Sequence, residues 1–122
     1  MKGATNMKKI IIYRAFDDED FYSEKECREY EANALACMHE IFDKVQFFDD
    51  FMGLMLAPEK DDINAYLGAF EAAYGEAPYM YIVERPSKEA LDFVYEYVGV
   101  SLPDGVGLFK YDGHSDKWKA AE

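Results

Sequence analysis

The sequence has few basic residues for its size. It contains 13 Lys and Arg against 25 Asp and Glu in 122 residues, which gives a formal net charge of −12 at pH 7. A protein with this charge repels nucleic acid and anionic membranes and attracts cationic partners. The composition therefore argues against direct nucleic-acid binding through a basic surface.

Long apolar runs and cysteine pairs are also missing. The longest apolar candidate is FMGLMLA, residues 51–57, which is far shorter than the roughly 20 residues of a membrane-spanning helix. No signal-peptide pattern opens the chain. Cys27 and Cys37 fall in one predicted helix, about 15 Å apart along its axis, too far to form a disulfide with each other. Unpaired thiols indicate a reducing, cytoplasmic location.

The rest of the composition indicates one folded domain. Half of the residues are apolar and 16% are aromatic, enough for a hydrophobic core in a chain of ordinary domain length. We expect residues 1–7 to be a flexible leader, with Met7 as an alternative start, and residues 8–122 to form a single α+β domain.

Strand and helix patterns alternate along the chain. Strands are expected at 8–16, 21–22, 45–48, 51–57, 79–84 and 105–111, with the tail after 115 an edge strand or a frayed end. Helices are expected from Ser23 to about Phe42, from Asp61 or Asp62 to a left-handed stop at Gly75, and from Pro86–Ser87 to Gly99. This alternation predicts a two-layer α+β sandwich, with a three- to five-stranded sheet and about three helices mainly on one face.

Enzymatic motifs are mostly absent. Cys37 and His39 are two residues apart on a helix and point about 200° away from each other, so they cannot form a local dyad. The stretch HEIFD (His39–Asp43) resembles half of H-E-x-x-H and leaves a metal-dependent enzyme as an alternative, with His39, Glu40 and Asp43 as its residues. DDED (Asp17–Asp20) fails the EF-hand pattern. The sequence favours a non-enzymatic protein without a cofactor or a metal.

The most unusual stretch is FDDEDFYSEKECREYE, residues 16–31, which holds eight carboxylates. Glu24 pairs with Arg28 and Lys25 with Glu29 at helical i,i+4 spacing. Glu24 and Glu26 also suit the first turn of a helix. No comparable structural role is evident for Asp17–Asp20 or for Glu31.

Further acids lie near other predicted turns, namely Asp49–Asp50, Glu59, Asp61 and Asp62. If these turns share one end of the sheet with Asp17–Asp20, they form an anionic surface that imitates nucleic acid and fits a Lys/Arg groove. The expected contact acids are Asp17, Asp18, Glu19, Asp20, Asp49, Asp50, Asp61 and Asp62. Aromatic side chains such as Tyr22 and Phe51 are the expected buried anchors.

The opening YRAFDDEDFYSEKECREYE resembles a pattern found at the start of small phage and prophage proteins of low-GC Gram-positive bacteria. In that pattern a strand ends in Ala-Phe-Asp-Gly, followed by a Phe, a Ser/Thr/Asp cap and Glu-Cys-x-x-Tyr-Glu. Here the features fall at Ala15, Phe16, Asp17, Phe21, Ser23, Glu26, Cys27, Tyr30 and Glu31, and Asp18 replaces the Gly. The resemblance covers about nineteen residues, is chiefly a fold signature, and implies a mobile-element origin. Small acidic phage proteins include anti-CRISPR proteins.

These observations lead to one main hypothesis and two alternatives. The main hypothesis is a phage-encoded inhibitor, a DNA mimic that binds a basic host protein such as a CRISPR effector nuclease in the host cytoplasm. The first alternative is a phage structural or assembly accessory protein that acts as a homo-oligomer, for example a homodimer, through the apolar patch Phe51–Leu56. The second is the metal-dependent enzyme described above.

Overall fold

The computed structural model of the chain describes residues 8–121. Its packing groups the residues into two compact units, Met1–Ala32 and Asn33–Glu122, which are described separately as the first and second unit. The single domain expected over residues 8–122 stays a prediction. The expected leader, residues 1–7, lies outside the described residues.

The first unit is a short hairpin with the beginning of a helix. Strands β1 (Tyr13–Arg14) and β2 (Asp20–Phe21) are antiparallel, with Tyr13 opposite Phe21. The expectation of a strand over residues 8–16 was wrong in length, because β2 offers β1 a partner over two residues only. Helix α1 (Glu24–Lys44) begins in this unit, after Ser23, whose Oγ accepts a hydrogen bond from the Glu26 N–H at 3.3 Å. This is one half of a capping box.

Aromatic packing joins this hairpin to the start of α1. The rings of Phe16 and Phe21 lie 6.0 and 5.1 Å from the ring of Tyr30, and Cys27 is buried. Phe16, Phe21 and Tyr30 of the N-terminal pattern therefore pack together between the hairpin and the helix.

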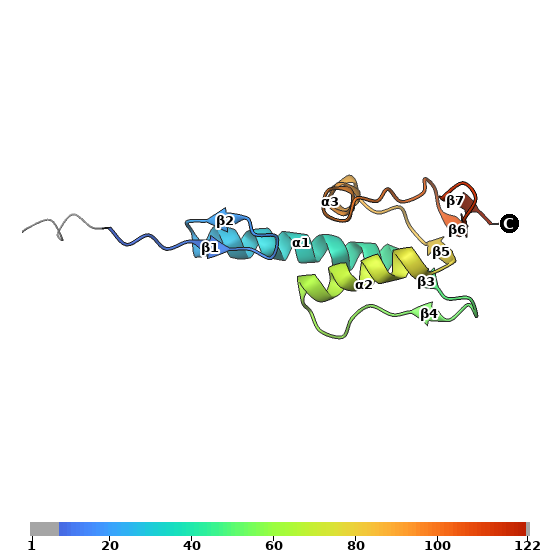
Figure 1. The fold of residues 1–122 in the computed structure, drawn as a ribbon, viewed down its shortest axis with the longest axis horizontal. Helices are drawn as coiled ribbons and strands as arrows, with labels where there is room; N and C mark the ends of the chain where they lie inside the picture. The colour runs from blue at the N-terminus through green and yellow to red at the C-terminus, as the bar shows by residue number, and fades with distance from the viewer. Residues whose placement is uncertain (1–7, 122) are drawn as a thin grey trace, which may run out of the picture. The chain divides into compact units, whose positions relative to one another are not determined.

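The second unit contains a five-stranded antiparallel sheet (Figure 1). Its strands are β3 (Val45–Phe48), β4 (Leu54–Met55), β5 (Tyr79–Ile82), β6 (Gly107–Asp112) and β7 (Lys117–Ala120), in the spatial order β4-β3-β5-β6-β7. The expected hairpin around Asp49–Asp50 is present as β3 and β4, but β4 covers Leu54–Met55 only, so the expected strand over residues 51–57 was wrong in length. The tail is an edge strand rather than a frayed end.

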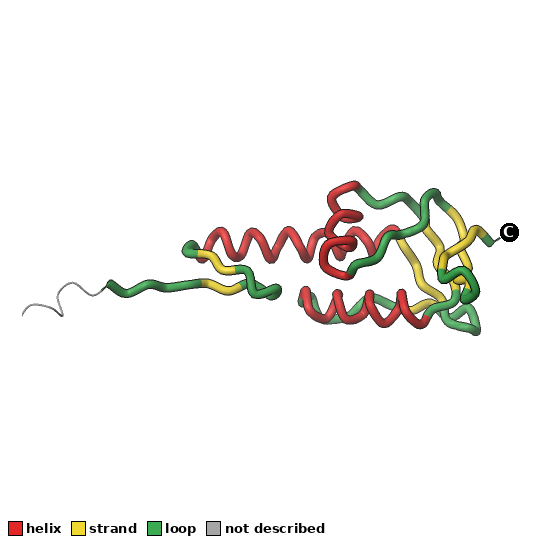
Figure 2. The backbone as a smooth tube through the Cα atoms, turned by 45° about the horizontal axis from the view of Figure 1, so that its top comes forward, coloured by secondary structure: helices red, strands yellow, loops and turns green. Residues whose placement is uncertain are grey.

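Side chains from one face of this sheet form the core with the helices. The register places Phe47 opposite Met80 and Met80 opposite Phe109, and all three are buried. Helices α2 (Ile63–Glu76) and α3 (Lys88–Val98) lie with the end of α1 on that side of the sheet (Figure 2). Phe70 of α2 meets Phe47 edge-on, with ring centroids 5.7 Å apart. The α+β sandwich predicted from the sequence is confirmed.

The helix ends agree with the sequence signals except at one position. Asp62 caps α2 by accepting from the Asn64 N–H, and Gly99 ends α3 in the left-handed region at φ 81°. The predicted stop at Gly75 was wrong, because α2 continues to Glu76 and is followed by Ala77 in an extended conformation. Pro78 comes next, and a proline disfavours helical angles in the residue before it.

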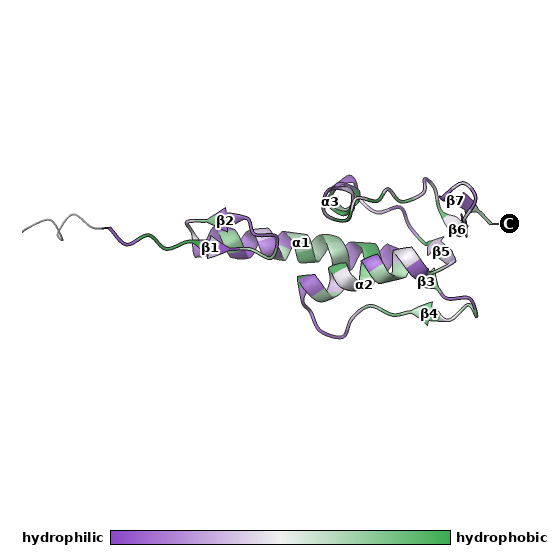
Figure 3. Cartoon of the chain, viewed as in Figure 1, coloured by the Kyte–Doolittle hydropathy of each residue, from purple (hydrophilic) through white to green (hydrophobic). Residues whose placement is uncertain are grey.

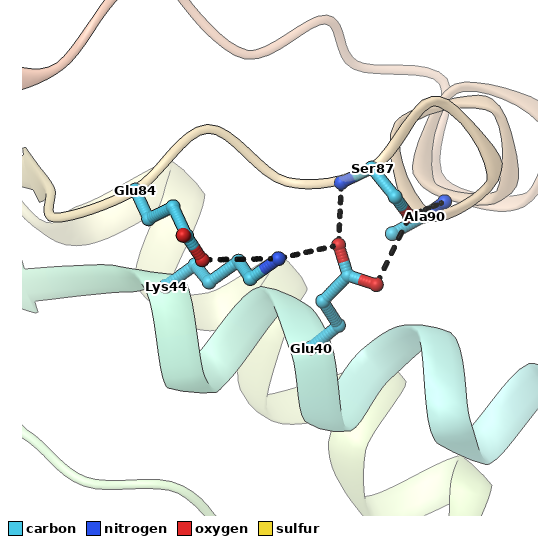
Figure 4. A network of polar contacts seen from close by, with 5 residues as sticks. All are labelled: Glu40, Lys44, Glu84, Ser87 and Ala90. Carbon is cyan, nitrogen blue, oxygen red and sulfur yellow. Dashed lines mark hydrogen bonds and ion pairs between the residues drawn. The ribbon is translucent and has the colours of Figure 1, made fainter.

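A polar network links the end of α1 to the start of α3 (Figure 4). The Ser87 N–H and hydroxyl both donate to the carboxylate of Glu40, the hydroxyl at 3.0 Å. Lys44 contacts Glu40 at 3.4 Å and Glu84 at 3.2 Å. The hydrogen bond from the Ser87 backbone is the main cause that lowers the pKa of Glu40.

Replacing Ser87 with alanine should lower the free energy of unfolding by about 1 kcal/mol. The change removes the N-cap acceptor of the Ala90 N–H, 3.2 Å away, together with the hydroxyl bond to Glu40. Urea denaturation of the variant, beside the exposed-serine control Ser101→Ala, measures the effect. Equal losses in the two variants would contradict this role for Ser87.

Cys27 and Cys37 are both free and buried. Burial raises the pKa of each thiol, which disfavours the reactive thiolate. Among residues 8–121, no helix is long and apolar enough to cross a membrane.

Candidate functional site: two acidic turns

Two of the predicted acidic segments form hairpin turns with the same backbone geometry. In the first acidic turn, residues 15–19, the Ala15 N–H donates to the Glu19 carbonyl at 2.9 Å and the Asp18 N–H to the Ala15 carbonyl at 3.0 Å. In the second acidic turn, residues 49–53, the Asp49 N–H donates to the Gly53 carbonyl at 2.9 Å and the Met52 N–H to the Asp49 carbonyl at 3.0 Å. Both turns therefore hold their residues in a fixed arrangement.

The fourth residue of each turn lies in the left-handed region. Asp18 has φ 67° and Met52 has φ 61°, a conformation that suits glycine best and asparagine or aspartate next. Asp18 stands where the phage pattern has glycine. The left-handed conformation at this position would explain a preference for glycine there. Met52 adopts this conformation while its apolar side chain is exposed.

The acids of the first unit divide into structural and exposed groups. Asp20 forms an ion pair with Arg14 at 2.7 Å, and this hydrogen bond lowers the pKa of Asp20. Asp17 accepts from the Tyr30 hydroxyl and from the Glu19 N–H. The Phe16 N–H donates to Glu31 at 3.0 Å. The expectation that Asp17, Asp20 and Glu31 lack structural roles was therefore wrong.

Asp18 and Glu19 differ from these residues. Both are exposed, and neither side chain makes a hydrogen bond or an ion pair within residues 8–121. They are the carboxylates of the first unit's turn that a partner can reach without displacing a contact of the fold.

The second acidic turn shows the same division. The Asp49 carboxylate accepts from the N–H groups of Phe51 and Gly53 at 2.9 and 2.7 Å and so fixes the turn. Asp50 is exposed, and in the described part of the chain its side chain has no polar partner. Asp50 is the available carboxylate of this turn.

Asp61 and Asp62 have structural roles at the start of α2. Asp62 is the helix N-cap, and Asp61 Oδ1 lies 2.5 Å from His39 Nε2 of α1. This end of α2 is also remote from the second acidic turn. The C-terminal end of α2 leads through Pro78 to Tyr79, which pairs with Phe48 immediately before Asp49, and a helix of 14 residues is about 21 Å long. Within the second unit, the two groups of acids do not share one end of the sheet.

Both predicted aromatic anchors are exposed next to the turns. Tyr22, two residues after Asp20, is 77% exposed, and Phe51 in the second acidic turn is 93% exposed. Each unit thus offers an accessible ring close to accessible carboxylates. Met52, Leu54 and Leu56 beside Phe51 are exposed as well, which is what the alternative of a homo-oligomer through the patch Phe51–Leu56 requires.

Comparison with protein families, curated proteins and solved structures gives no match. The phage-protein resemblance therefore stays a prediction.

Two of the three residues of the alternative metal site, His39 and Glu40, are engaged elsewhere, while Asp43 is exposed. Glu40 binds Ser87 and Lys44, and His39 contacts Asp61. In the part of the chain that the structure describes, no group of three or more His, Cys, Asp or Glu side chains is placed to hold a metal ion.

The last residue of β6, before the turn to β7, is an acid with a structural role. Asp112 lies 2.8 Å from Lys119 and accepts from the His114 N–H and the Ser115 hydroxyl, both at 3.0 Å. Together these contacts lower the pKa of Asp112 to about 2, and the hydrogen bond from Lys119 is the largest cause.

The low pKa of Asp112 predicts a pH dependence of stability. Because the pKa is depressed in the folded state, this carboxylate stabilises the fold above about pH 4, and the contribution is lost as the pH falls toward about 2. Asp112→Asn should therefore show a smaller drop in Tm between about pH 5 and pH 2.5 than the unaltered protein. Asp50→Asn, which removes an exposed carboxylate without a polar partner among the described residues, is the control. An unchanged drop in the Asp112 variant would contradict this role.

Proposed function

We propose that this chain is a non-enzymatic, phage-encoded inhibitor that binds a basic nucleic-acid-binding groove of a host defence protein. The observation that carries the proposal is the pair of acidic turns. Each turn has a fixed backbone and exposed carboxylates, and an exposed ring lies within the second turn (Phe51) or three residues after the first (Tyr22). A CRISPR effector nuclease in the bacterial cytoplasm is the leading candidate for the target.

The mechanism follows from charge and shape. Asp18, Glu19 and Asp50 take the places of phosphates and accept charge-assisted hydrogen bonds from Lys and Arg of the groove. Tyr22 and Phe51 enter apolar recesses beside those contacts and exclude water from them. The net charge of −12 attracts the chain to a basic surface and raises the association rate at low salt. Nucleic acid is then excluded by occupancy.

Five of the eight expected contact acids have structural roles in the fold. Asp17, Asp20, Asp49, Asp61 and Asp62 hold turns, caps or ion pairs of the fold. In the proposal they add to the negative field, while Asp18, Glu19 and Asp50 make the direct contacts. The two turns act as separate contact points and need not form one continuous patch.

A competition assay tests the proposal. A purified CRISPR effector nuclease is titrated with the chain, before and after loading with its nucleic acid. The expected result is binding to the unloaded nuclease, inhibition of cleavage, and relief of both by excess nucleic acid. A stable ternary complex of chain, nuclease and nucleic acid would overturn the proposal.

A second candidate function has an observation of its own. The apolar patch Phe51–Leu56 is exposed at Phe51, Met52, Leu54 and Leu56, the last by 78%. Contiguous exposed apolar side chains mark interaction sites on soluble proteins. This favours a homo-oligomeric assembly accessory protein as the alternative, and light scattering on the purified chain tests it directly. A monomer at all concentrations would remove this candidate.

A further inference from the structure

The sheet of the second unit has one protected edge and one unprotected edge. The β7 edge carries Lys117 and Lys119, and charges of this kind discourage strand pairing between molecules. The β4 edge lies in the uncharged stretch Phe51–Ala57, where Leu54 and Leu56 are exposed. A strand edge with apolar, uncharged side chains is a template for another strand.

The backbone of β4 directs hydrogen-bonding groups outward at this edge. Asp49 and Gly53 form a hydrogen-bonded pair, and Phe47 lies opposite Met55. Because paired and unpaired positions alternate in an antiparallel ladder, the N–H and carbonyl of Leu54 point away from β3. Among residues 8–121, no strand lies on that side of β4. The edge therefore has both donors and acceptors to offer.

The first unit contains an apolar segment that belongs to no strand. Residues 8–12 precede β1, belong to no strand, and make no backbone hydrogen bond to another described segment. Ile10, Ile11 and Ile12 are all exposed, Ile10 by 71%, and Figure 3 shows this stretch as strongly hydrophobic. Three consecutive β-branched residues favour a paired strand.

The flanking charges of the two segments are complementary. Lys8 and Lys9 stand at the start of the isoleucine segment, whereas Asp50 and Glu59 stand on either side of the β4 edge. Opposite charges then meet whether the added strand runs parallel or antiparallel. Pairing β4 with β4 of another molecule would bring acids against acids, which is unfavourable.

We propose that Lys8–Tyr13 of one molecule pairs with the free edge of β4 in a second copy and adds a sixth strand to its sheet. The inference rests on the homo-oligomeric candidate and specifies its interface. The pairing site on β4 is short, because β4 covers Leu54–Met55 and Met52 before it lies in the left-handed region. Reciprocal exchange of this strand between two copies closes a dimer.

A complementation experiment with two edge variants tests this pairing. Ile11→Pro removes an N–H from the isoleucine segment, and Leu54→Pro removes the outward N–H of β4 without touching its bonds to β3. In size-exclusion chromatography with light scattering, each variant alone should be monomeric, with its dimer dissociation constant raised at least about tenfold. An equimolar mixture should form a 1:1 dimer, because one intact contact remains.

Ala120→Pro is the matched control. The Ala121 N–H donates to Leu108, and Lys110 lies opposite Lys119. Ala120 therefore presents its N–H to the free edge of β7, as Leu54 does at β4. This variant should dimerise like the unaltered chain, and circular dichroism shows that all three variants remain folded.

The outcomes separate the pairing from the broader candidate. A dimer that survives Ile11→Pro but not Leu54→Pro would overturn the pairing and leave the homo-oligomer in place. A dimer that survives both changes would overturn the pairing as well. A monomeric unaltered chain would overturn both the pairing and the homo-oligomer. None of these results bears on nuclease inhibition, which is measured separately.

Discussion

Replacing Phe70 with alanine should lower the free energy of unfolding by about 3–5 kcal/mol. Phe70 is fully buried between the sheet and its helices, against Phe47 at 5.7 Å and Tyr74 at 5.8 Å. Alanine leaves a cavity in a core that cannot fully close around it. Small domains are stable by only about 5–15 kcal/mol, so the variant should unfold at a much lower urea concentration.

Phe51→Ala is the control for this prediction. The same ring is removed, but from a position that is 93% exposed, so stability should change by less than about 0.5 kcal/mol. Similar losses for the two variants would contradict the assignment of Phe70 to the core. A loss at Phe51 alone would indicate that an oligomer buries the second acidic turn.

Reversing the charge of two turn acids should weaken target binding by about 10- to 100-fold. The variant combines Glu19→Lys with Asp50→Lys, one change in each acidic turn. Neither carboxylate makes a polar side-chain contact within the described residues, so the fold should tolerate both changes. Each lysine would face the Lys and Arg side chains of the proposed groove, and repulsion of like charges costs several kcal/mol in close contacts. Inhibition of nuclease cleavage at fixed salt is the measurement.

A control with the same net charge separates the turns from the overall field. Glu71→Lys with Glu96→Lys changes two exposed helical acids and moves the formal charge by the same amount, from −12 to −8. This control should lose at most a few-fold in inhibition, through slower association. Equal losses in the two variants would show that the turns have no special role.

Much of the fold could be predicted from the sequence because it rests on local signals. Ser23, Asp62 and Ser87 begin their helices, and Gly99 ends one. Alternating burial in the four residues of β3 agrees with a strand that is covered on one face. Signals of this kind depend on near neighbours in the chain, so they can be found without knowledge of the tertiary structure.

The errors occur where a distant residue or a neighbouring proline determines where a strand or helix ends. Residues 8–12 have a strong strand pattern but find no partner among the described residues, and the strand therefore shortens to Tyr13–Arg14. Gly75 was expected to stop α2, but Pro78 sets the end of that helix instead.

The candidate site was harder to predict than the fold. The acids are all visible in the sequence, but whether a carboxylate is free depends on contacts such as Glu31 with the Phe16 N–H, or Asp61 with His39. These contacts span 15 and 22 residues. Charge counting cannot distinguish a carboxylate that holds the fold together from one that is available to a partner.

The most direct test of the central claim is the salt dependence of binding to the purified nuclease. The claim is that turn carboxylates meet a basic groove, so the dissociation constant should rise steeply between about 50 and 300 mM salt, as screening weakens exposed charge contacts. The variant with Glu19→Lys and Asp50→Lys should show a shallower dependence. Binding that is equally tight at every salt concentration, or equal slopes for the variant and the unaltered chain, would contradict the account.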